Sequence, residues 1–155
     1  MKVSAVMTKT PHIVHPDDSL QSVANKMCEL DIGFLPIGEG DRLLGAITDR
    51  DIAVRAVARG KSPDTRVGDF MSKEILYCFE DDDVDAVMKN MAQVKVRRMP
   101  VLNRNKRLVG VVSVADAALD HKPAVAGGAL AGIARPGGAH SQSPKSQKLP
   151  ALAAL

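Results

Sequence analysis

An internal repeat constrains the fold of this chain more than any other sequence feature. The segment Leu35-Pro36-Ile37 returns 64 positions later as Met99-Pro100-Val101. The segment Gly45-Ala46-Ile47-Thr48 returns 65 positions later as Gly110-Val111-Val112-Ser113, because the second copy has one extra residue in the preceding turn. We therefore expect one structural unit that is present twice. The predicted divisions are a first repeat, 1–61, a second repeat, 62–120, and a C-terminal segment, 121–155.

The hydrophobic periods follow the same order in both repeats and predict the secondary structure of each. Apolar residues at helical spacing, behind Ser19 or behind acidic residues, are typical of amphipathic helices. Two short apolar runs separated by turn-prone residues then predict a hairpin. A strand candidate precedes these elements and a second helix follows them, so each repeat is a β-α-β-β-α unit and the fold class is α+β. The predicted elements are strands at 12–14 and 75–79, helices at 20–30 and 84–94, hairpins at 32–48 and 96–113, and closing helices at 51–59 and 114–120.

The C-terminal segment differs from the repeats in charge and composition. All 18 acidic residues and 17 of the 21 Lys and Arg residues lie in 1–120, so the repeats carry −1, whereas 121–155 carries +4. Gly, Ala, Pro, Ser, Gln and Lys dominate 121–155, and such a composition buries too little apolar surface to offset the entropy lost on ordering. We expect this segment to be largely disordered, with at most a brief helical or docked stretch near 129–134.

Cysteine usage and the start of the chain predict a cytoplasmic protein. Cys28 and Cys78 have no C-x-x-C spacing, and each falls at an apolar position of a predicted element. We therefore expect both to be buried, reduced thiols. The first residues lack the apolar core of a signal peptide. The longest weakly apolar run, 123–134, is about half of a membrane span, so no membrane association is expected.

The duplicated unit resembles a known family. Each copy has a Pro-containing strand and a Gly-x-x-Thr/Ser-x-x-Asp segment, at 45–51 and 110–116. Together these features resemble the CBS-domain family in its paired form, the Bateman module, as found in small stand-alone bacterial proteins. The resemblance covers about 1–119. It implies two repeats related by pseudo-twofold symmetry and packed through their sheets, two clefts for adenosine-containing ligands, and a homodimer.

The Thr/Ser-x-x-Asp spacing suits recognition of a ribose and its phosphate. Thr48 and Asp51 stand one helical turn apart, Ser113 and Asp116 repeat the arrangement, and in each pair the two side chains can share a face. A carboxylate can accept both ribose hydroxyl protons, while the hydroxyl and helix N–H groups face a phosphate. The same spacing is also a capping box, which satisfies helix donors without any ligand. Both interpretations stay open, and the two hydroxyls can serve both roles.

Adenine is expected between apolar strand segments whose backbone groups hydrogen-bond to the base. Such segments are also core candidates, because apolar strand residues are normally buried. The adenine-site candidates are Thr10, Pro11, His12, Ile13, Phe34, Leu35, Pro36, Ile75, Tyr77, Met99 and Pro100.

Basic residues distinguish the two repeats. Arg50 lies inside the first motif, where the second has Ala115. Arg97 and Arg98 precede Met99, where the first repeat has a glycine and a phenylalanine. Because a guanidinium is a natural phosphate partner, we expect two unequal sites. The alternative is that these arginines are solvated or paired with acids. Two further phosphate candidates occupy matching positions, Lys9 and Lys73.

The chain shows no catalytic constellation. It has no G-x-G-x-x-G segment, no Walker-type loop and no cluster of His, Cys and Glu, so we expect neither enzymatic activity nor a required cofactor. His12 and His15 share one segment, but uncoordinated histidines are favoured over a zinc site there. The Asp81–Asp83 run is explained by a helix N-terminus and lacks the EF-hand spacing, so no metal is expected.

These features favour a non-catalytic regulatory module for signal transduction. Its ligand would be AMP, ADP, ATP, NAD or S-adenosylmethionine, which share the adenosine group, and its protein target cannot be named from the sequence. One alternative is a structural dimerisation module with empty clefts. Another is a weak nucleic-acid binder acting through Arg97, Arg98 and the basic tail. Nucleic acid is disfavoured because one Tyr, three Phe and no Trp offer few stacking platforms.

Overall fold

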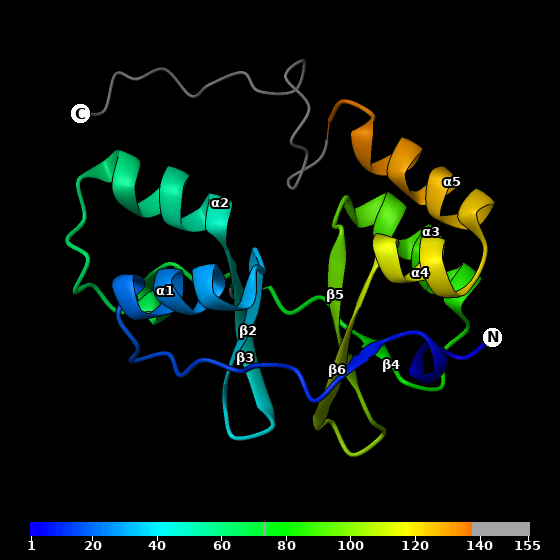
Figure 1. The fold of residues 1–155 in the computed structure, drawn as a ribbon, viewed down its shortest axis with the longest axis horizontal. Helices are drawn as coiled ribbons and strands as arrows, with labels where there is room; N and C mark the ends of the chain where they lie inside the picture. The colour runs from blue at the N-terminus through cyan, green and yellow to red at the C-terminus, as the bar shows by residue number, and fades with distance from the viewer. Residues whose placement is uncertain (73, 138–155) are drawn as a thin grey trace. The chain divides into compact units, whose positions relative to one another are not determined.

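The computed structural model describes residues 1–72 and 74–137, which form two compact units (Figure 1). The first-repeat unit comprises Thr10–Leu76 with Lys106–Leu108. The second-repeat unit comprises Met1–Lys9, Tyr77–Asn105 and the described residues from Val109 onward. Each unit therefore takes its leading segment from the other repeat. The internal repeat in the sequence does not reveal this exchange, because the exchange depends on pairing between segments far apart in the chain.

The first-repeat unit contains one helix, one hairpin and a short closing helical segment. Helix α1 (Leu20–Leu30) precedes strands β2 (Phe34–Glu39) and β3 (Arg42–Thr48), which pair antiparallel with Leu35 opposite Ile47. Val14 forms an isolated parallel bridge with Ile37, at the end of the predicted strand 12–14. The predicted helix 20–30 and the predicted hairpin are thus confirmed.

Helix α1 is fixed by its caps and by one apolar face. The Ser19 hydroxyl accepts a hydrogen bond from the Ser22 N–H, and Asp31 ends the helix in the left-handed region at φ 52°. Leu20, Val23 and Met27 face the core. The prediction that Cys28 is buried is wrong: it is exposed, because successive helix residues are rotated by about 100° and Met27 takes the core-facing position.

The closing helical segment of the first repeat is less regular than predicted. It begins as α2 (Asp49–Asp51), continues as a π-helical turn over Ile52–Ala56, and ends in a 3₁₀ turn over Val57–Arg59. Gly60 terminates it in the left-handed region at φ 69°, directly after the predicted helix 51–59. Only Ala56 of this segment is fully buried.

The second-repeat unit is built on a four-stranded sheet of order β1-β6-β5-β4. Strand β5 (Arg98–Leu102) and strand β6 (Leu108–Ser113) form the predicted hairpin. Strand β4 (Cys78–Phe79) pairs parallel with β5, whereas β1 (Thr8–Lys9), which the sequence did not indicate, pairs antiparallel with β6. Helices α3 (Val84–Val94) and α4 (Val114–Asp120) match the predicted helices.

A fifth helix follows the second repeat. Helix α5 (Pro123–Ala134) contacts α3 and α4 in the same unit, and Figure 1 shows it beside them. It starts six residues before the brief stretch allowed by the composition. Ala126, Ala129 and Ile133 are buried, so small side chains that contribute little individually still form a continuous contact with α3 and α4. The remainder of the predicted tail, 138–155, lies outside the described residues.

Candidate functional site

The first candidate site is the junction between β3 and α2, where the structure forms a complete capping box. The Thr48 hydroxyl accepts a hydrogen bond from the Asp51 N–H at 3.1 Å, and Asp51 Oδ2 accepts one from the Thr48 N–H at 2.9 Å. Asp51 Oδ1 lies 3.8 Å from an Arg55 guanidinium nitrogen. The Asp51 side chain is 26% exposed, so the carboxylate remains accessible from solvent.

The second junction, between β6 and α4, repeats this geometry. Ser113 Oγ accepts from the Asp116 N–H at 3.1 Å, and Asp116 Oδ2 accepts from the Ser113 N–H at 2.7 Å. The Ser113 hydroxyl also donates to Asp116 Oδ2 at 2.8 Å. Asp116 Oδ1 has no partner among residues 1–72 and 74–137.

The capping interpretation of the motif is therefore realised at both junctions. Capping uses the Oδ2 oxygen of each aspartate. Asp51 Oδ1 lies beside the Arg55 guanidinium, whereas Asp116 Oδ1 has no partner in the described part of the chain. A carboxylate offers about four acceptor positions, so one cap bond leaves room for ribose hydroxyl donors. The structure thus brings together Thr48 with Asp51 and Ser113 with Asp116, as the spacing predicted.

The basic candidates occupy different surroundings. Arg50, Arg97 and Arg98 are exposed, and none of their guanidinium groups has a partner within the described part of the chain. Lys9 is exposed on β1, opposite Gly110. Lys73 lies outside the described residues. The alternative, in which these arginines pair with acids, is not seen at the Arg50 guanidinium within the described residues; only the Arg50 backbone N–H donates to an acid, to Asp49 Oδ1 at 2.7 Å.

The adenine-site candidates divide into core and surface residues. In the first-repeat unit Leu35 and Pro36 are buried, Pro11, Ile13 and Phe34 are half-buried, and Thr10, His12 and Ile75 are exposed. In the second-repeat unit Met99 and Pro100 are buried, and half-buried Tyr77 meets the Phe79 ring edge-on. Leu35 and Met99 are at most 1% exposed, so they are core residues first.

One pocket adjoins the second junction, with a volume of about 410 Å³. It brings together three predicted site residues, Arg97, Arg98 and Ser113, with residues of α4, whereas Asp116 does not line it. It also has a wall that the sequence analysis missed, because α5 was assigned to a disordered tail. A proline at the first helical position followed by an unbroken apolar run was the available signal. The α5 residues lining the pocket are Pro123, Ala126, Gly127 and Leu130.

The remaining candidates for chemistry are a buried cysteine and the possible metal ligands. Burial raises the pKa of the Cys78 thiol to about 12, which confirms a buried thiol at this position and makes it unreactive. Within residues 1–72 and 74–137, no three His, Cys, Asp or Glu side chains gather to hold a metal ion. None of the helices described in this range has the length and apolarity to cross a bilayer.

Comparison with known proteins agrees with this architecture. The chain is 34% identical over 118 residues to the CBS domain-containing protein YhcV of Bacillus subtilis, covering 76% of this chain and 84% of YhcV. The crystal structure of Hypoxic Response Protein I, with two coordinated zinc ions, has a TM-score of 0.71 at 35% identity, covering 77% of this chain and 98% of that one. The CBS domain pair of MJ0100, in complex with 5′-methylthioadenosine and S-adenosyl-L-methionine, has a TM-score of 0.69 at 28% identity, covering 76% and 93%.

These relatives are small proteins or isolated domain pairs, of which the present chain covers nearly the whole length. The family model of the CBS domain matches residues 3–57 and 67–119, which is more than half of the chain and includes both junctions. The chain therefore belongs to the CBS-domain family and contains a pair of CBS domains.

Proposed function

We propose that this protein is a non-catalytic regulatory module that binds adenosine-containing ligands at its two junction motifs. The observation that carries the proposal is the duplicated Thr/Ser–Asp box, in which each aspartate keeps one carboxylate oxygen outside the cap. The complex of the MJ0100 domain pair with two adenosine compounds supports this choice of ligand class. AMP, ADP, ATP, NAD and S-adenosylmethionine all carry the group that such a motif would recognise.

The chemistry of recognition follows from the groups at each junction. The carboxylate oxygen that the cap does not use, Oδ1 of Asp51 beside Arg55 or Oδ1 of Asp116, would accept the ribose hydroxyl protons. A hydrogen bond to a charged acceptor is worth about 1.5–3 kcal/mol. Phosphate would be held by unpaired guanidinium groups, from Arg50 in the first repeat and from Arg97 and Arg98 in the second. The second site would therefore hold phosphate more firmly.

The decisive experiment separates ligand binding from capping. We would measure binding of the five ligands by calorimetry to the wild type, Asp51→Asn, Asp116→Asn and the double variant. Asparagine keeps an oxygen that accepts the cap N–H but loses the charge. We therefore expect little loss of stability and a loss of affinity of about tenfold or more, the equivalent of 1.4 kcal/mol. The variants Asp51→Ala and Asp116→Ala should lose both stability and ligand affinity.

Ser19→Ala is the matched control. This residue caps α1 but belongs to neither motif, so its loss should cost about 1 kcal/mol of stability and leave ligand affinity unchanged. If the wild type bound none of the five ligands at millimolar concentration, the proposal would be overturned. A salt-dependent shift of DNA or RNA that survives removal of 121–155 would favour the nucleic-acid alternative.

A homodimer is part of the same proposal. Val54 and Leu119 occupy equivalent positions in the closing helical segments of the two repeats and are 47% and 83% exposed, and Val57 is 66% exposed. Large apolar side chains exposed at repeated positions support self-association. Sedimentation should show a dimer for the wild type and a monomer for Leu119→Lys. A dimer without ligand binding would instead favour the structural module.

Regulation would then rest on population shift. A ligand that binds one state of the module more tightly stabilises that state by no more than the difference in affinity. The stabilised state would be recognised by a protein target in the cytoplasm. Turnover of any of the five ligands by the purified protein would contradict the non-catalytic assignment.

A further inference from the structure

Helix α5 lies beyond the residues matched by the family, yet it is built into the second-repeat unit. A Cβ added to Gly132 would lie 2.7 Å from the Ala92 Cβ, so the helix backbone comes close to α3. The Lys95 ammonium donates to the Gly132 carbonyl at 3.2 Å and also to the Arg135 carbonyl. These contacts hold the C-terminal end of α5.

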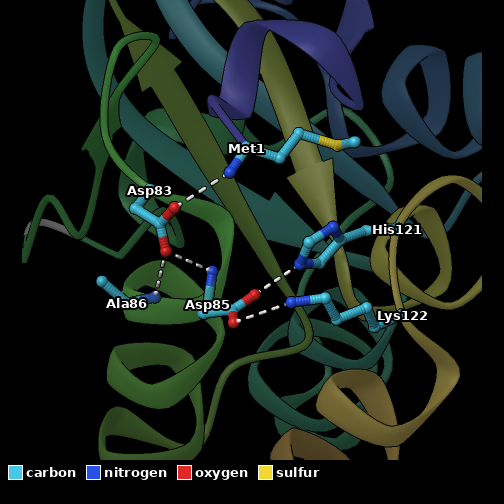
Figure 2. A network of polar contacts seen from close by, with 6 residues as sticks. All are labelled: Met1, Asp83, Asp85, Ala86, His121 and Lys122. Carbon is cyan, nitrogen blue, oxygen red and sulfur yellow. Dashed lines mark hydrogen bonds and ion pairs between the residues drawn. The ribbon is translucent and has the colours of Figure 1, made fainter.

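The N-terminal end of α5 is held by a second set of polar contacts, shown in Figure 2. His121 Nε2 contacts Asp85 Oδ1, and the Lys122 ammonium lies 3.5 Å from Asp85 Oδ2. The hydrogen bond with His121 is the main reason that the pKa of Asp85 lies below its ordinary value. His121 and Lys122 directly precede α5, so their contacts with Asp85 tie the start of this helix to α3. The helix is thus held at one end by Asp85 of α3 and at the other by Lys95, which directly follows α3.

In this position α5 completes the pocket of about 410 Å³ beside the second junction. The opposite wall comes from the start of β5 and from α4. The pocket has an apolar part and a charged part. Apolar side chains from α4 and α5 line most of it, and two guanidinium groups lie at one side. The lining residues are Arg97, Arg98, Ser113, Val114, Ala115, Ala118, Pro123, Ala126, Gly127 and Leu130.

The charge of this pocket is not compensated. No acidic side chain lines it, and neither Arg97 nor Arg98 has a side-chain partner in the described chain. The Arg97 carbonyl accepts the Val114 N–H at 3.1 Å, so the backbone that carries these arginines is fixed to the start of α4. Two unpaired guanidinium groups on a fixed backbone, beside an apolar wall, suit an anion that also carries an apolar body.

The size of the pocket narrows the ligand further. Small-molecule sites span roughly 300–1,000 Å³, and this pocket lies near the lower end. Without α5 one entire wall, including half-exposed Leu130, would be missing and the pocket would open to solvent. The helix therefore limits the space beside the second junction to a compound the size of a mononucleotide.

We infer that α5 is a specificity-determining wall of the second site, selecting a mononucleotide with its phosphate on Arg97 and Arg98, and that the bound ligand in turn holds α5 in place. The inference rests on the proposed function, since it specifies the ligand of one of the two proposed sites. It assigns to the helix after the CBS pair both a binding role and a response to binding. A ligand that contacts α5 only when it is docked must stabilise the docked state.

Two neighbouring glycines supply the test. Gly127 and Gly128 are both exposed in α5 and a Cβ at either meets nothing within 4 Å, but only Gly127 lines the pocket. Gly127→Leu should fill the pocket, and Gly128→Leu should add the same side chain outside it. Both would be made in an Asp51→Asn background, which leaves the second motif intact. AMP, adenosine and NAD are the probes, followed by calorimetry.

We expect AMP to bind the Gly128→Leu protein as it binds the background, and Gly127→Leu to weaken AMP at least tenfold. NAD should bind at least tenfold more weakly than AMP, and replacing Arg97 and Arg98 by Gln should make AMP and adenosine bind alike. Hydrogen exchange of the α5 amides should slow when AMP is added, and not in Gly127→Leu. Asp116→Asn should abolish that slowing in the same background.

The outcomes separate the two proposals. If AMP binds and Gly127→Leu behaves like Gly128→Leu, or exchange in α5 does not respond to AMP, the inference about α5 is overturned while the proposed function stands. Equal affinity for NAD and AMP would also overturn it. If none of the three probes binds the wild type, the proposed function itself fails. Circular dichroism of each variant confirms that a loss of affinity does not reflect unfolding.

Discussion

The two junctions share a backbone and differ in charge. Both form the same capping box, with nearly the same distances between hydroxyl, carboxylate and backbone N–H. Around it, the first repeat has Gly33, Asp49 and Arg50, where the second has Arg97, Val114 and Ala115. A Cβ at Gly33 would lie 2.5 Å from an Asp49 carboxylate oxygen, so a side chain like that of Arg97 would displace the Asp49 carboxylate from its present position.

Comparing the two junctions separates the residues that the fold requires from the residues that a ligand would contact. The features common to both repeats, namely the cap, the buried strand residues and a glycine in each second hairpin strand, satisfy the backbone and the core. The features that differ are charged and solvent-exposed, and surface substitutions seldom alter stability by more than about 0.5 kcal/mol. We therefore expect matched substitutions to affect stability equally in the two units and ligand affinity unequally.

The largest expected effect concerns the buried strand residues Leu35 and Met99, which are equivalent and almost fully buried. Truncating either to alanine leaves a cavity and should cost about 2–5 kcal/mol of unfolding free energy. Urea denaturation of the two variants measures it. If only one of the two variants lost little unfolding free energy, that residue would border an open ligand site rather than the core. The two positions would then not be equivalent.

Gly45 and Gly110 should show the next largest effect. A Cβ at Gly45 would lie 2.7 Å from the Ser72 carbonyl oxygen, and at Gly110 it would lie 2.6 Å from the Met7 sulfur and 2.9 Å from the Thr8 carbonyl oxygen. Valine at either position should therefore overpack the strand and cost about 1–3 kcal/mol. Gly128→Ala is the control, because nothing lies near its Cβ and the change should stabilise α5 by about 0.5–1 kcal/mol. Thermal unfolding of the three variants decides the point.

Phosphate affinity should separate the two sites. Arg50→Ala makes the first junction resemble the second at this position, and Ala115→Arg does the reverse. If each site holds phosphate through its own arginines, Arg50→Ala should weaken AMP at the first site about tenfold, the equivalent of 1.4 kcal/mol, and leave adenosine unchanged. Ala115→Arg should strengthen AMP at the second site. Calorimetry would measure the first site in an Asp116→Asn background and the second site in an Asp51→Asn background. If Arg50→Ala or Ala115→Arg changed the affinities for AMP and adenosine equally, the prediction would be contradicted.

Loss of the cap hydroxyl should have similar, smaller effects in both repeats. Thr48→Ala and Ser113→Ala each remove the acceptor for one helix N–H and should cost about 1 kcal/mol. The second variant should lose slightly more, because the Ser113 hydroxyl also donates to Asp116. Replacing Thr48 by Ser and Ser113 by Thr keeps the hydroxyl and should restore stability in denaturant unfolding. A failure of this rescue would assign the cost to something other than the cap.

The sequence predicted the elements that both repeats share better than it predicted which segments pack against each other. Periodicity located the helices and hairpins because each buries one face, and the duplicated box followed from residue spacing alone. The exchange of leading segments depends on contacts between residues far apart in the chain, such as the hydrogen bond from the Val3 N–H to the Asp82 carbonyl at 2.9 Å. Only the last part of helix α5, near 129–134, was allowed by the sequence, because its small side chains offer little apolar surface and its stability depends on contacts with α3 and α4.

The smallest expected effect lies where the second-repeat unit has a contact that the first lacks. Asp85 and His121 are paired, whereas their equivalents in the first repeat are Gln21 and Ala56. The hydrogen bond with His121 lowers the pKa of Asp85 below its ordinary value of 3.8. The folded state therefore keeps this carboxylate charged to lower pH than the unfolded state does. The resulting stabilisation is present above about pH 5 and is lost as the pH falls through 3.8 toward the folded pKa.

Asp85→Asn should accordingly be less stable than the wild type at neutral pH, and the difference should shrink as the pH falls from 5 to 3. Urea unfolding across this range measures it, with His121→Gln as a second variant that removes the other partner. Asp64→Asn is the control, because the Asp64 carboxylate has no partner among the described residues. A constant difference at all pH values would show that the pair fixes the start of α5 by shape rather than charge. In that case this pair would not make the docking of α5 dependent on pH.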